Sequence, residues 1–457
     1  MQPTKGEGTL NYIGSINAGQ GADAAQYGLR TGQDASAAQY GLRVGHGADA
    51  AQSGFRVGRG ADAAQSGSRS WLVLPGVARV GRRLGRRRSP ERIPFPSCLA
   101  ACLRYIGDYY PWLLVREHSM DCRLDYSYIQ TMGVTGMAFG LLWGPGWSSG
   151  SAGLMSIAGP DEIIDRAFRA AGRAYETVWN TGKPGDNDAL RGALIESLER
   201  RRPVLAFGVI GPPECCIITG YDYERDAVIG WSFYQDDARF AQEVEHEPNG
   251  YFRLQGWAPN TAGLVTIGDK TGNVARPFDS AQSALSILNW ALRIVHTPDA
   301  HSQKSGLAAY TAWAEQLVHD SDFAPHDEQQ LRQRYAVHDS AVDAVAECRW
   351  TASRFLTLTA DALPELSAPL LSAAEYYRQE HGLMLGAWAA VGGVANPEAH
   401  ARFADPAVRR RIAGIISSAR EADARAAGMI GQAATAAIAQ REHRGKPGAG
   451  SPRMPDA

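Results

Sequence analysis

Two short stretches of the sequence carry the residues best suited to thiol chemistry. In "GPPECCIITGYD", residues 211–222, Glu214 stands directly before two adjacent cysteines at the start of an apolar run of strand length. In "PSCLAACLRYIG", residues 96–107, Cys98 follows a proline and a serine that favour the start of a helix. Free N–H groups and the positive end of the dipole at a helix N-terminus favour a thiolate and can stabilise an oxyanion. Cys98 is therefore the best candidate nucleophile.

Glu214 and Cys216 are the candidate partners of this thiol. Strand alternation places these two side chains on one face and Cys215 on the other, so the pair can face a cleft that contains Cys98. A buried glutamate beside a thiol can be held protonated by desolvation and donate a hydrogen bond. The alternative is that the cysteines are small buried apolar residues, as free cysteines often are. Cys102, one helical turn after Cys98, favours this alternative for at least one of the two.

A zinc site is a weaker interpretation of the cysteines. Cys98, Cys102, Cys216 and Cys122 could supply thiolates, but the sequence contains no CxxC pair. Six cysteines in 457 residues are sparse, and in a reducing compartment we expect thiols rather than disulfides, including at the adjacent Cys215 and Cys216. We therefore predict no metal and no cofactor.

Aromatic residues supply the candidate substrate contacts. "TGMAFGLLWGPGWSSG", residues 135–150, is rich in glycine and tryptophan and too irregular for a plain helix. Trp143 and Trp147 either belong to a loop that lines a cleft or are ordinary core tryptophans around a tight turn. Tyr221 and Trp231, in the predicted strands, are further candidates for substrate binding.

The elements that must position these residues lie between residues 93 and 277, where helical and strand patterns are mixed. Helical spacing predicts a first helix in residues 97–114, with Ser97 as its cap, and two more in 161–172 and 187–201. Short apolar runs bounded by Gly, Pro or Asp predict an antiparallel meander, with strands in residues 203–210, 215–222, 226–233, 250–254 and 264–269.

The pattern changes after this region to long helices. Their apolar spacing predicts an antiparallel bundle over residues 278–442. The predicted helices are residues 281–295, 306–318, 328–363, 371–391 and 406–427. Residues 443–457 are expected to be disordered.

The amino-terminal part has a different composition. Residues 19–70 divide into four near-identical units of 13 residues, each with several glycines and at most two large apolar side chains. Such units bury too little apolar surface to offset chain entropy. The arginine-rich stretch 77–92 has no interleaved aromatic residues, which favours a flexible linker over a contact with a polyanion or a membrane. We therefore predict that residues 1–92 are disordered.

The order of the elements resembles the papain-like fold. The points of likeness are "PSCLAACLRYIG", "GVTGMAFGLLWGPGW", "RRPVLAFGV" and "IITGYD". They are similar to the bacteriocin-processing peptidases and, more narrowly, to the N-terminal domain family of butirosin-biosynthesis protein H. The resemblance covers about residues 93–440. It implies an α+β papain-like domain, with an N-terminal helix packed on an antiparallel sheet, followed by an all-α helical bundle.

The sequence departs from that family at both positions that support the nucleophile. The family has a histidine six residues before Gly220, where this chain has Glu214, and an acid near Ser232, where it has none. A Cys–His nucleophile needs an imidazole to take and return a proton, and glutamate does this poorly near neutral pH. His118 and His246 are expected to be surface residues.

The resemblance implies cysteine-dependent acyl or amide transfer or hydrolysis through Cys98, in secondary metabolism, with an acyl-carrier protein as a partner. The alternative is a catalytically inactive relative that binds a peptide or small metabolite, with Glu214 as a recognition group. A third possibility is a scaffold whose bundle forms a homo-oligomer.

Charge and hydropathy narrow the classes of partner. A net charge of −2 gives no basic field for nucleic acid, and no apolar run is long enough to cross a membrane. The amino-terminal residues lack the pattern of a secretory signal, so a cytoplasmic location is expected.

Overall fold

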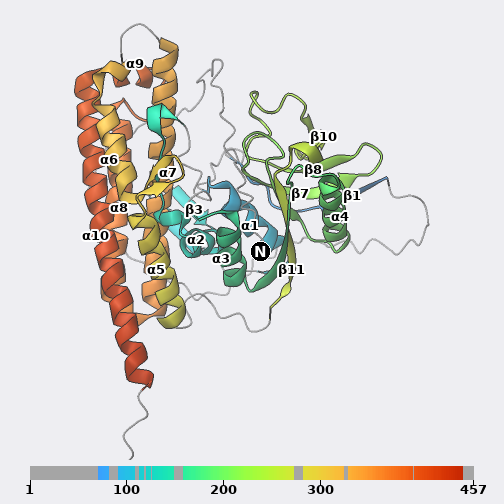
Figure 1. Cartoon of the computed structure of the whole chain (residues 1–457), viewed down its shortest axis with the longest axis horizontal. Coiled ribbons are helices and arrows are strands. Elements are labelled where there is room, and N and C mark those ends of the chain that lie inside the picture. The colour runs from blue at the N-terminus through green and yellow to red at the C-terminus, as the bar shows by residue number, and fades with distance from the viewer. Residues whose placement is uncertain are drawn as a thin grey trace, which may run out of the picture.

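The computed structural model describes residues 70–81, 91–108, 113–117, 120–124, 126–148, 158–271, 281–323, 328–394 and 396–445. Within these residues a twisted sheet with helices against it is followed by long helices that stand side by side next to it (Figure 1). The structure is therefore α+β with a carboxy-terminal helical bundle, as the sequence predicted. The tandem repeats up to residue 69 and the tail after residue 445 lie outside the described residues.

The main sheet is antiparallel at every described pairing. Its order is β5-β11-β6-β7-β8-β10-β9, so the predicted meander is present, and the last strand returns to pair beside the first of the meander. The strands are β5 (Arg173–Trp179), β6 (Val204–Phe207), β7 (Cys215–Asp222), β8 (Ala227–Trp231), β9 (Glu245–His246), β10 (Phe252–Gln255) and β11 (Gly263–Lys270).

One edge of β7 is shared by two strands. Its first half, Cys215–Ile218, pairs with β6, and its second half, Gly220–Asp222, pairs with β1 (Trp71–Val73). The prediction that residues 1–92 are disordered is therefore wrong for residues 70–81. The physical reason is that the segment after the repeats is apolar enough to cover the sheet, and Leu74, Val77 and Val80 are buried there.

Helix α1 (Pro94–Tyr105) begins earlier than the sequence predicted. Ile93 is its N-cap, and the Ser97 hydroxyl does not cap the helix but donates back to the Ile93 carbonyl at 2.9 Å. Proline suits the first helical positions, where its missing N–H is not needed, so Pro94 opens the helix. Cys98 is consequently one full turn inside α1.

The predicted continuation of this helix to residue 114 is wrong. The helix ends at Tyr105, and Gly107 follows with a left-handed φ of 83°. A β-hairpin then forms from β2 (Leu113–Glu117) and β3 (Met120–Leu124).

Three further helices accompany the sheet. They are α2 (Tyr126–Val134), α3 (Pro160–Ala171) and α4 (Asp186–Glu199). The last two were predicted, and Gly172 ends α3 in the left-handed conformation that glycine favours. Helix α2 was not predicted.

The glycine- and tryptophan-rich stretch after α2 is ordered where it is described. It forms η1 (Met137–Phe139), β4 (Leu142–Trp143) and η2 (Pro145–Trp147). Strand β4 pairs with β13 (Gln303–Ser305), which pairs with β12 (Asp299–Ala300), so this stretch is fastened to the bundle.

The bundle contains all the helices predicted for it. These are α5 (Ala281–His296), α6 (Gly306–Leu317), α7 (Glu328–Ala362), α8 (Ser367–Ala390) and α10 (Pro406–Gly445), with a short α9 (Ala399–Phe403) before the last. Single 3₁₀ turns form η4 (Ala258–Asn260), η5 (Asp320–Phe323) and η6 (Pro364–Leu366). None of the helices in the described part of the chain combines the length and the apolar character that a membrane span needs.

The sheet, its helices and the bundle share one apolar core. The cluster that contains Cys98 and the sheet residues also contains Phe355 of α7 and Tyr377 of α8. Phe139 joins the two parts, with ring centroids 6.3 Å from Phe355 and 5.7 Å from Tyr377. At Gly133 of α2 a Cβ atom would lie 2.0 Å from the Phe355 ring, so only glycine allows this approach.

Candidate functional site

The candidate thiol lies where α1 packs against the first residues of β7. Cys98 is completely buried, and its Sγ donates a hydrogen bond to the carbonyl oxygen of Cys215 at 3.5 Å. Pro94 is the first residue of α1, and the ring of Phe95 stacks on that of Phe207 in β6, with centroids 6.2 Å apart. Apolar side chains therefore lie between the start of this helix and the sheet.

Four buried thiols gather at this junction. Burial raises the pKa of Cys102, Cys215 and Cys216, and the neighbouring Cys98 raises each of them further. Cys215, which strand alternation placed on the face opposite Cys216, also hydrogen-bonds through its side chain with Cys98. These four cysteines and Cys348 of α7 are free thiols. The cluster is therefore a set of buried thiols, and burial disfavours the thiolate form of Cys102, Cys215 and Cys216.

Glu214 is the last residue of the loop before β7. Its N–H donates to the Pro212 carbonyl at 2.6 Å, and its carbonyl accepts from the N–H of Gly208 at 3.2 Å. The residue is partly exposed, and it directly precedes Cys215, whose carbonyl receives the Cys98 thiol. The structure thus brings Cys98, Glu214 and Cys216 to the same end of β7.

Ser232, where the resemblance places an acid, lies just after β8 and is buried. Its N–H donates to Oε1 of Gln235 at 3.0 Å, and its hydroxyl accepts from the N–H of Tyr234 at 3.1 Å. Gln235, also buried, donates to the Gly250 carbonyl at 3.0 Å. These hydrogen bonds stabilise the loop that follows β8. The polar groups of Ser232 are used within that loop.

His118 and His246 were both expected to be surface residues. His246 is exposed on β9, with Nε2 3.9 Å from a carboxylate oxygen of Asp236, as expected of a surface histidine. His118 lies outside the described residues. Among the residues described from 91 to 271, His246 is the one histidine, so those residues bring no imidazole to Cys98.

Trp143 and Trp147 do not belong to the thiol cluster. They lie in a second apolar core, where Trp143 stacks on Trp313 of α6 at 5.2 Å. Their indole N–H groups donate to Gln316 at 2.8 Å and to Asp322 at 2.9 Å. Of the two alternatives for these tryptophans, the structure favours core residues, because the pairing of β4 with β13 places this stretch against the bundle.

Tyr221 is engaged within the α/β part. Its hydroxyl donates to Asp226 at 2.6 Å, and burial raises its pKa to about 12. Asp226 in turn receives the guanidinium of Arg191, so the tyrosine is tied to α4.

Trp231 is covered by the segment that follows β1. Its indole N–H donates to the Val77 carbonyl at 3.1 Å, and its ring packs on Tyr251 at 4.4 Å. Arg79 lies over the outer side of the ring, 5.2 Å from its centroid. Both this tryptophan and Tyr221 therefore hold the fold together.

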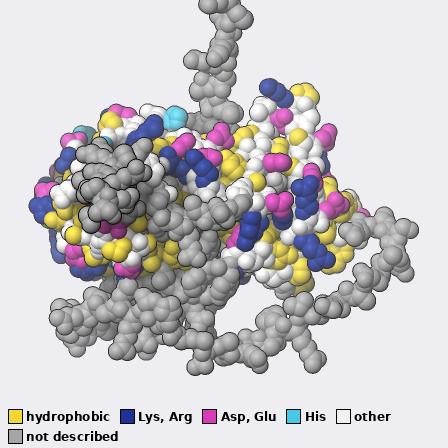
Figure 2. Space-filling model, turned by 90° about the horizontal axis from the view of Figure 1, so that it is seen from below, with side chains coloured by type: hydrophobic (Ala, Val, Ile, Leu, Met, Phe, Trp, Pro, Cys, Tyr) yellow, Lys and Arg dark blue, Asp and Glu magenta, His cyan; other side chains and the backbone are white. Residues whose placement is uncertain are grey.

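The described residues were also searched for groups that could hold a metal ion and for a basic surface that could bind a polyanion. They contain no group of three or more His, Cys, Asp or Glu side chains arranged to hold a metal ion. On the face seen in Figure 2, basic and acidic side chains are interspersed over the described atoms, so that face shows no extended field of one sign.

Sequence reasoning missed a set of buried charges in the bundle. Arg349, Glu380 and Asp423 are fully buried and interact with one another. A signal was present, because these charges recur on the otherwise apolar face of α7, α8 and α10, but it can be recognised only once the helices are placed together.

The chain was compared with protein-family models and with curated proteins, and neither comparison found a match. Its function is therefore argued from the geometry of the site.

Proposed function

We propose that the chain is a catalytically inactive relative of the papain-like cysteine peptidases and acyltransferases, and that it binds a peptide or small metabolite without transforming it. The observation that carries this proposal is the placement of Cys98, which is completely buried and whose Sγ donates a hydrogen bond to the Cys215 carbonyl. A nucleophilic cysteine reacts as a thiolate and must be reachable by its substrate.

The start of α1 gives Cys98 little help in forming a thiolate. Pro94 and Pro96 have no N–H, and the N–H of Ser97 already donates to the Ile93 carbonyl at 3.3 Å. A helix activates a cysteine or stabilises an oxyanion through free N–H groups in its first turn. Because Cys98 follows that turn, these effects are weak at its sulfur.

The residue in the position of the family's histidine also works against activation. If Glu214 is ionised, its negative charge beside the cluster disfavours a second negative charge on sulfur. Ser232, in the position of the orienting acid, is bonded to its own loop. Glu214, being partly exposed at the end of β7, suits recognition of a cationic or hydrogen-bonding group better than proton transfer.

A second candidate function is acyl transfer through Cys98. The observation that favours it is that Cys98 and Glu214 lie at the same end of β7, as they would in a papain-like enzyme. Here Glu214 would take the thiol proton, Cys98 would receive the acyl group from a carrier-protein thioester with release of the carrier thiol, and an amine would then accept the acyl group.

Alkylation by iodoacetamide at pH 7 separates the two candidates. Peptide mass spectrometry would follow Cys98 in the wild type and in Glu214→His, with Cys98→Ser to confirm the assignment. An inactive relative should react at Cys98 no faster than free cysteine, and Glu214→His should change the rate little, because a base does not expose the buried sulfur. A wild-type rate about tenfold or more above free cysteine, reduced in Glu214→His, would favour the enzyme instead.

A further inference from the structure

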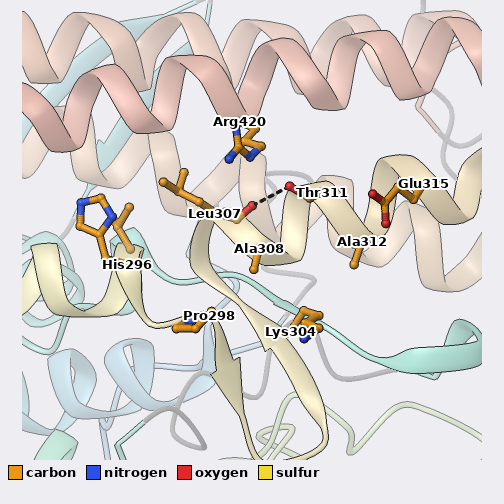
Figure 3. Close-up of a pocket in the computed structure, with 10 residues that line it drawn as sticks. His296, Pro298, Lys304, Leu307, Ala308, Thr311, Ala312, Glu315 and Arg420 are labelled. Atoms are coloured by element: carbon orange, nitrogen blue, oxygen red, sulfur yellow. Dashed lines mark hydrogen bonds between the residues drawn. The ribbon is translucent and has the colours of Figure 1, made fainter.

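The bundle contains a cavity far along the chain from the thiol cluster. It has a volume of about 400 Å³ and is bounded by the end of α5, the β12–β13 hairpin, the side of α6 and the middle of α10 (Figure 3). Small-molecule sites in proteins commonly have volumes of about 300–1,000 Å³, so this cavity is large enough for a small ligand.

The floor of the cavity is apolar. It is formed mainly by Leu307, Ala308 and Ala312 of α6, with Val295 and Pro298 at one side. The Thr311 hydroxyl, the polar group in the middle of this floor, donates to the Leu307 carbonyl at 3.3 Å (Figure 3). The floor therefore offers apolar contact for a side chain.

Charges of opposite sign stand around this floor. Arg420 of α10 and Lys304 of β13 supply cations, and Glu315 of α6 supplies a carboxylate. Lys304 pairs with Asp299 at 2.6 Å, whereas Arg420 and Glu315 form no ion pair with any residue in the described part of the chain. One free guanidinium and one free carboxylate thus border the same cavity.

We propose that this cavity binds a short peptide with free ends, with its carboxylate at Arg420 and Lys304 and its amino group at Glu315. Arginine binds a carboxylate through two parallel hydrogen bonds, which favours a peptide terminus over a neutral group. A purely anionic ligand would meet repulsion from Glu315, and a purely cationic one would meet repulsion from Arg420. The inference does not rest on the proposed role of the thiol cluster, because every residue of this cavity belongs to the bundle elements.

The spacing along α6 sets the length of the ligand. Figure 3 shows Arg420 over the stretch from Leu307 to Thr311, with Glu315 farther along the same helix. At 1.5 Å per residue the stretch from Leu307 to Glu315 is about 12 Å long, and that from Thr311 to Glu315 about 6 Å. An extended peptide covers at most about 3.3–3.6 Å per residue, so two or three residues span this separation and a single amino acid does not.

The test is isothermal titration calorimetry on the full chain, with the tripeptide alanyl-leucyl-alanine as the probe. The same peptide with an acetylated amino end, and with an amidated carboxyl end, removes one ligand charge at a time. The matched protein variants are Arg420→Ala and Glu315→Gln, and Arg425→Ala removes an exposed arginine of α10 outside the cavity.

We expect the wild type to bind the free peptide, and Arg420→Ala to weaken that binding by about tenfold, a loss typical of a charge-assisted hydrogen bond. The amidated peptide, which lacks the carboxylate, should bind equally weakly to the wild type and to Arg420→Ala. The acetylated peptide, which lacks the charged amino group, should bind equally weakly to the wild type and to Glu315→Gln. Arg425→Ala should bind as the wild type does.

Three results would each overturn the proposal: no binding of the free peptide to the wild type at about 5 mM, equal affinity for free and capped peptides, or equal weakening by Arg425→Ala. Because Cys98 takes no part in any of these measurements, such a failure would leave the proposed function of the α/β part standing.

Discussion

Arg349 is a fully buried arginine of the bundle with several polar partners. It is fully buried in α7 and donates to the carbonyl oxygens of Ala138 and Gly140, at 2.9 and 3.1 Å. It also pairs with Asp423 at 2.7 Å and with Glu380 at 3.3 Å. Burial raises the pKa of Glu380 well above its usual range.

Replacing Arg349 with methionine should therefore destabilise the protein severely. The change leaves Asp423 buried without its counter-ion and two carbonyl groups without their donor. Removing one partner of a buried ion pair costs about 3–5 kcal/mol, which urea unfolding would measure. The control is Arg332→Met on the same helix, where an exposed arginine pairs with Glu328 and little change is expected. A near-neutral Arg349→Met would show that the cluster does not stabilise the fold.

Glu347 should make stability depend on pH. Its carboxyl group accepts from the Arg92 N–H at 2.7 Å and from the hydroxyl of Tyr128, and burial raises its pKa to about 8. The folded state thus holds a proton that the unfolded state releases near its ordinary pKa of about 4.3, so this contribution to stability falls as pH rises from about 4.3 to 8. Glu347→Gln should flatten the decline in the urea midpoint between about pH 5 and 8. An unchanged slope would contradict the raised pKa.

The helices and strands with a regular spacing of apolar residues could be predicted from the sequence, and those without it could not. The long helices α7, α8 and α10 and the strands from β6 to β8 were predicted, because their apolar residues recur at helical or strand spacing. Strand β5 was missed because it follows α3 after a single glycine and is only partly buried. Local patterns cannot show which distant strand a segment will join.

The start of α1 shows a similar limit at the candidate site. Ser97 has the type of a cap, and Pro94 has the type of a first helical residue, so the sequence allowed both starts. The structure uses Pro94, and this shift moves Cys98 out of the first turn. The closeness of Cys98 to the start of β7 could be predicted from the resemblance, but its complete burial could not, since burial depends on the packing of the whole cluster.

Strand β1 should contribute measurably to stability. The segment 70–81 pairs with β7, and the Leu74 N–H donates to the Thr219 carbonyl at 2.7 Å. It also covers Trp231 and Tyr251. We expect a chain that begins at residue 70 to melt as the full chain does, and one that begins at residue 82 to melt a few degrees lower, since each kcal/mol lost lowers the melting temperature by about 2–4 °C or less in a folding unit of more than about 150 residues. Equal melting temperatures by circular dichroism would show that β1 adds nothing.

At the scale of the whole molecule, the α/β part and the bundle are joined by one core. The sequence suggested two domains, residues 93–277 and 278–442, because the pattern changes between them. Phe355 of α7, however, lies in the same apolar cluster as the sheet and contacts Phe139. A continuous core of this kind is expected to unfold cooperatively.

Calorimetry of the full chain should therefore show a single unfolding transition. Phe355→Ala removes the side chain that joins the two parts and should cost about 3–5 kcal/mol, lowering that one transition as a whole. Two separate transitions in the wild type, with only one of them shifted by Phe355→Ala, would mean that the two parts fold independently.

We propose that Cys98 is a buried core thiol and not a nucleophile, and its alkylation as a function of urea tests this proposal most directly. If Cys98 is inaccessible in the folded protein, its rate of modification by iodoacetamide should rise with urea in parallel with the fraction of unfolded molecules. The rate without urea should then be far below that of free cysteine. A fast rate that is already present without urea, and that does not change until the protein unfolds, would show a reactive thiol in the native state and contradict the account.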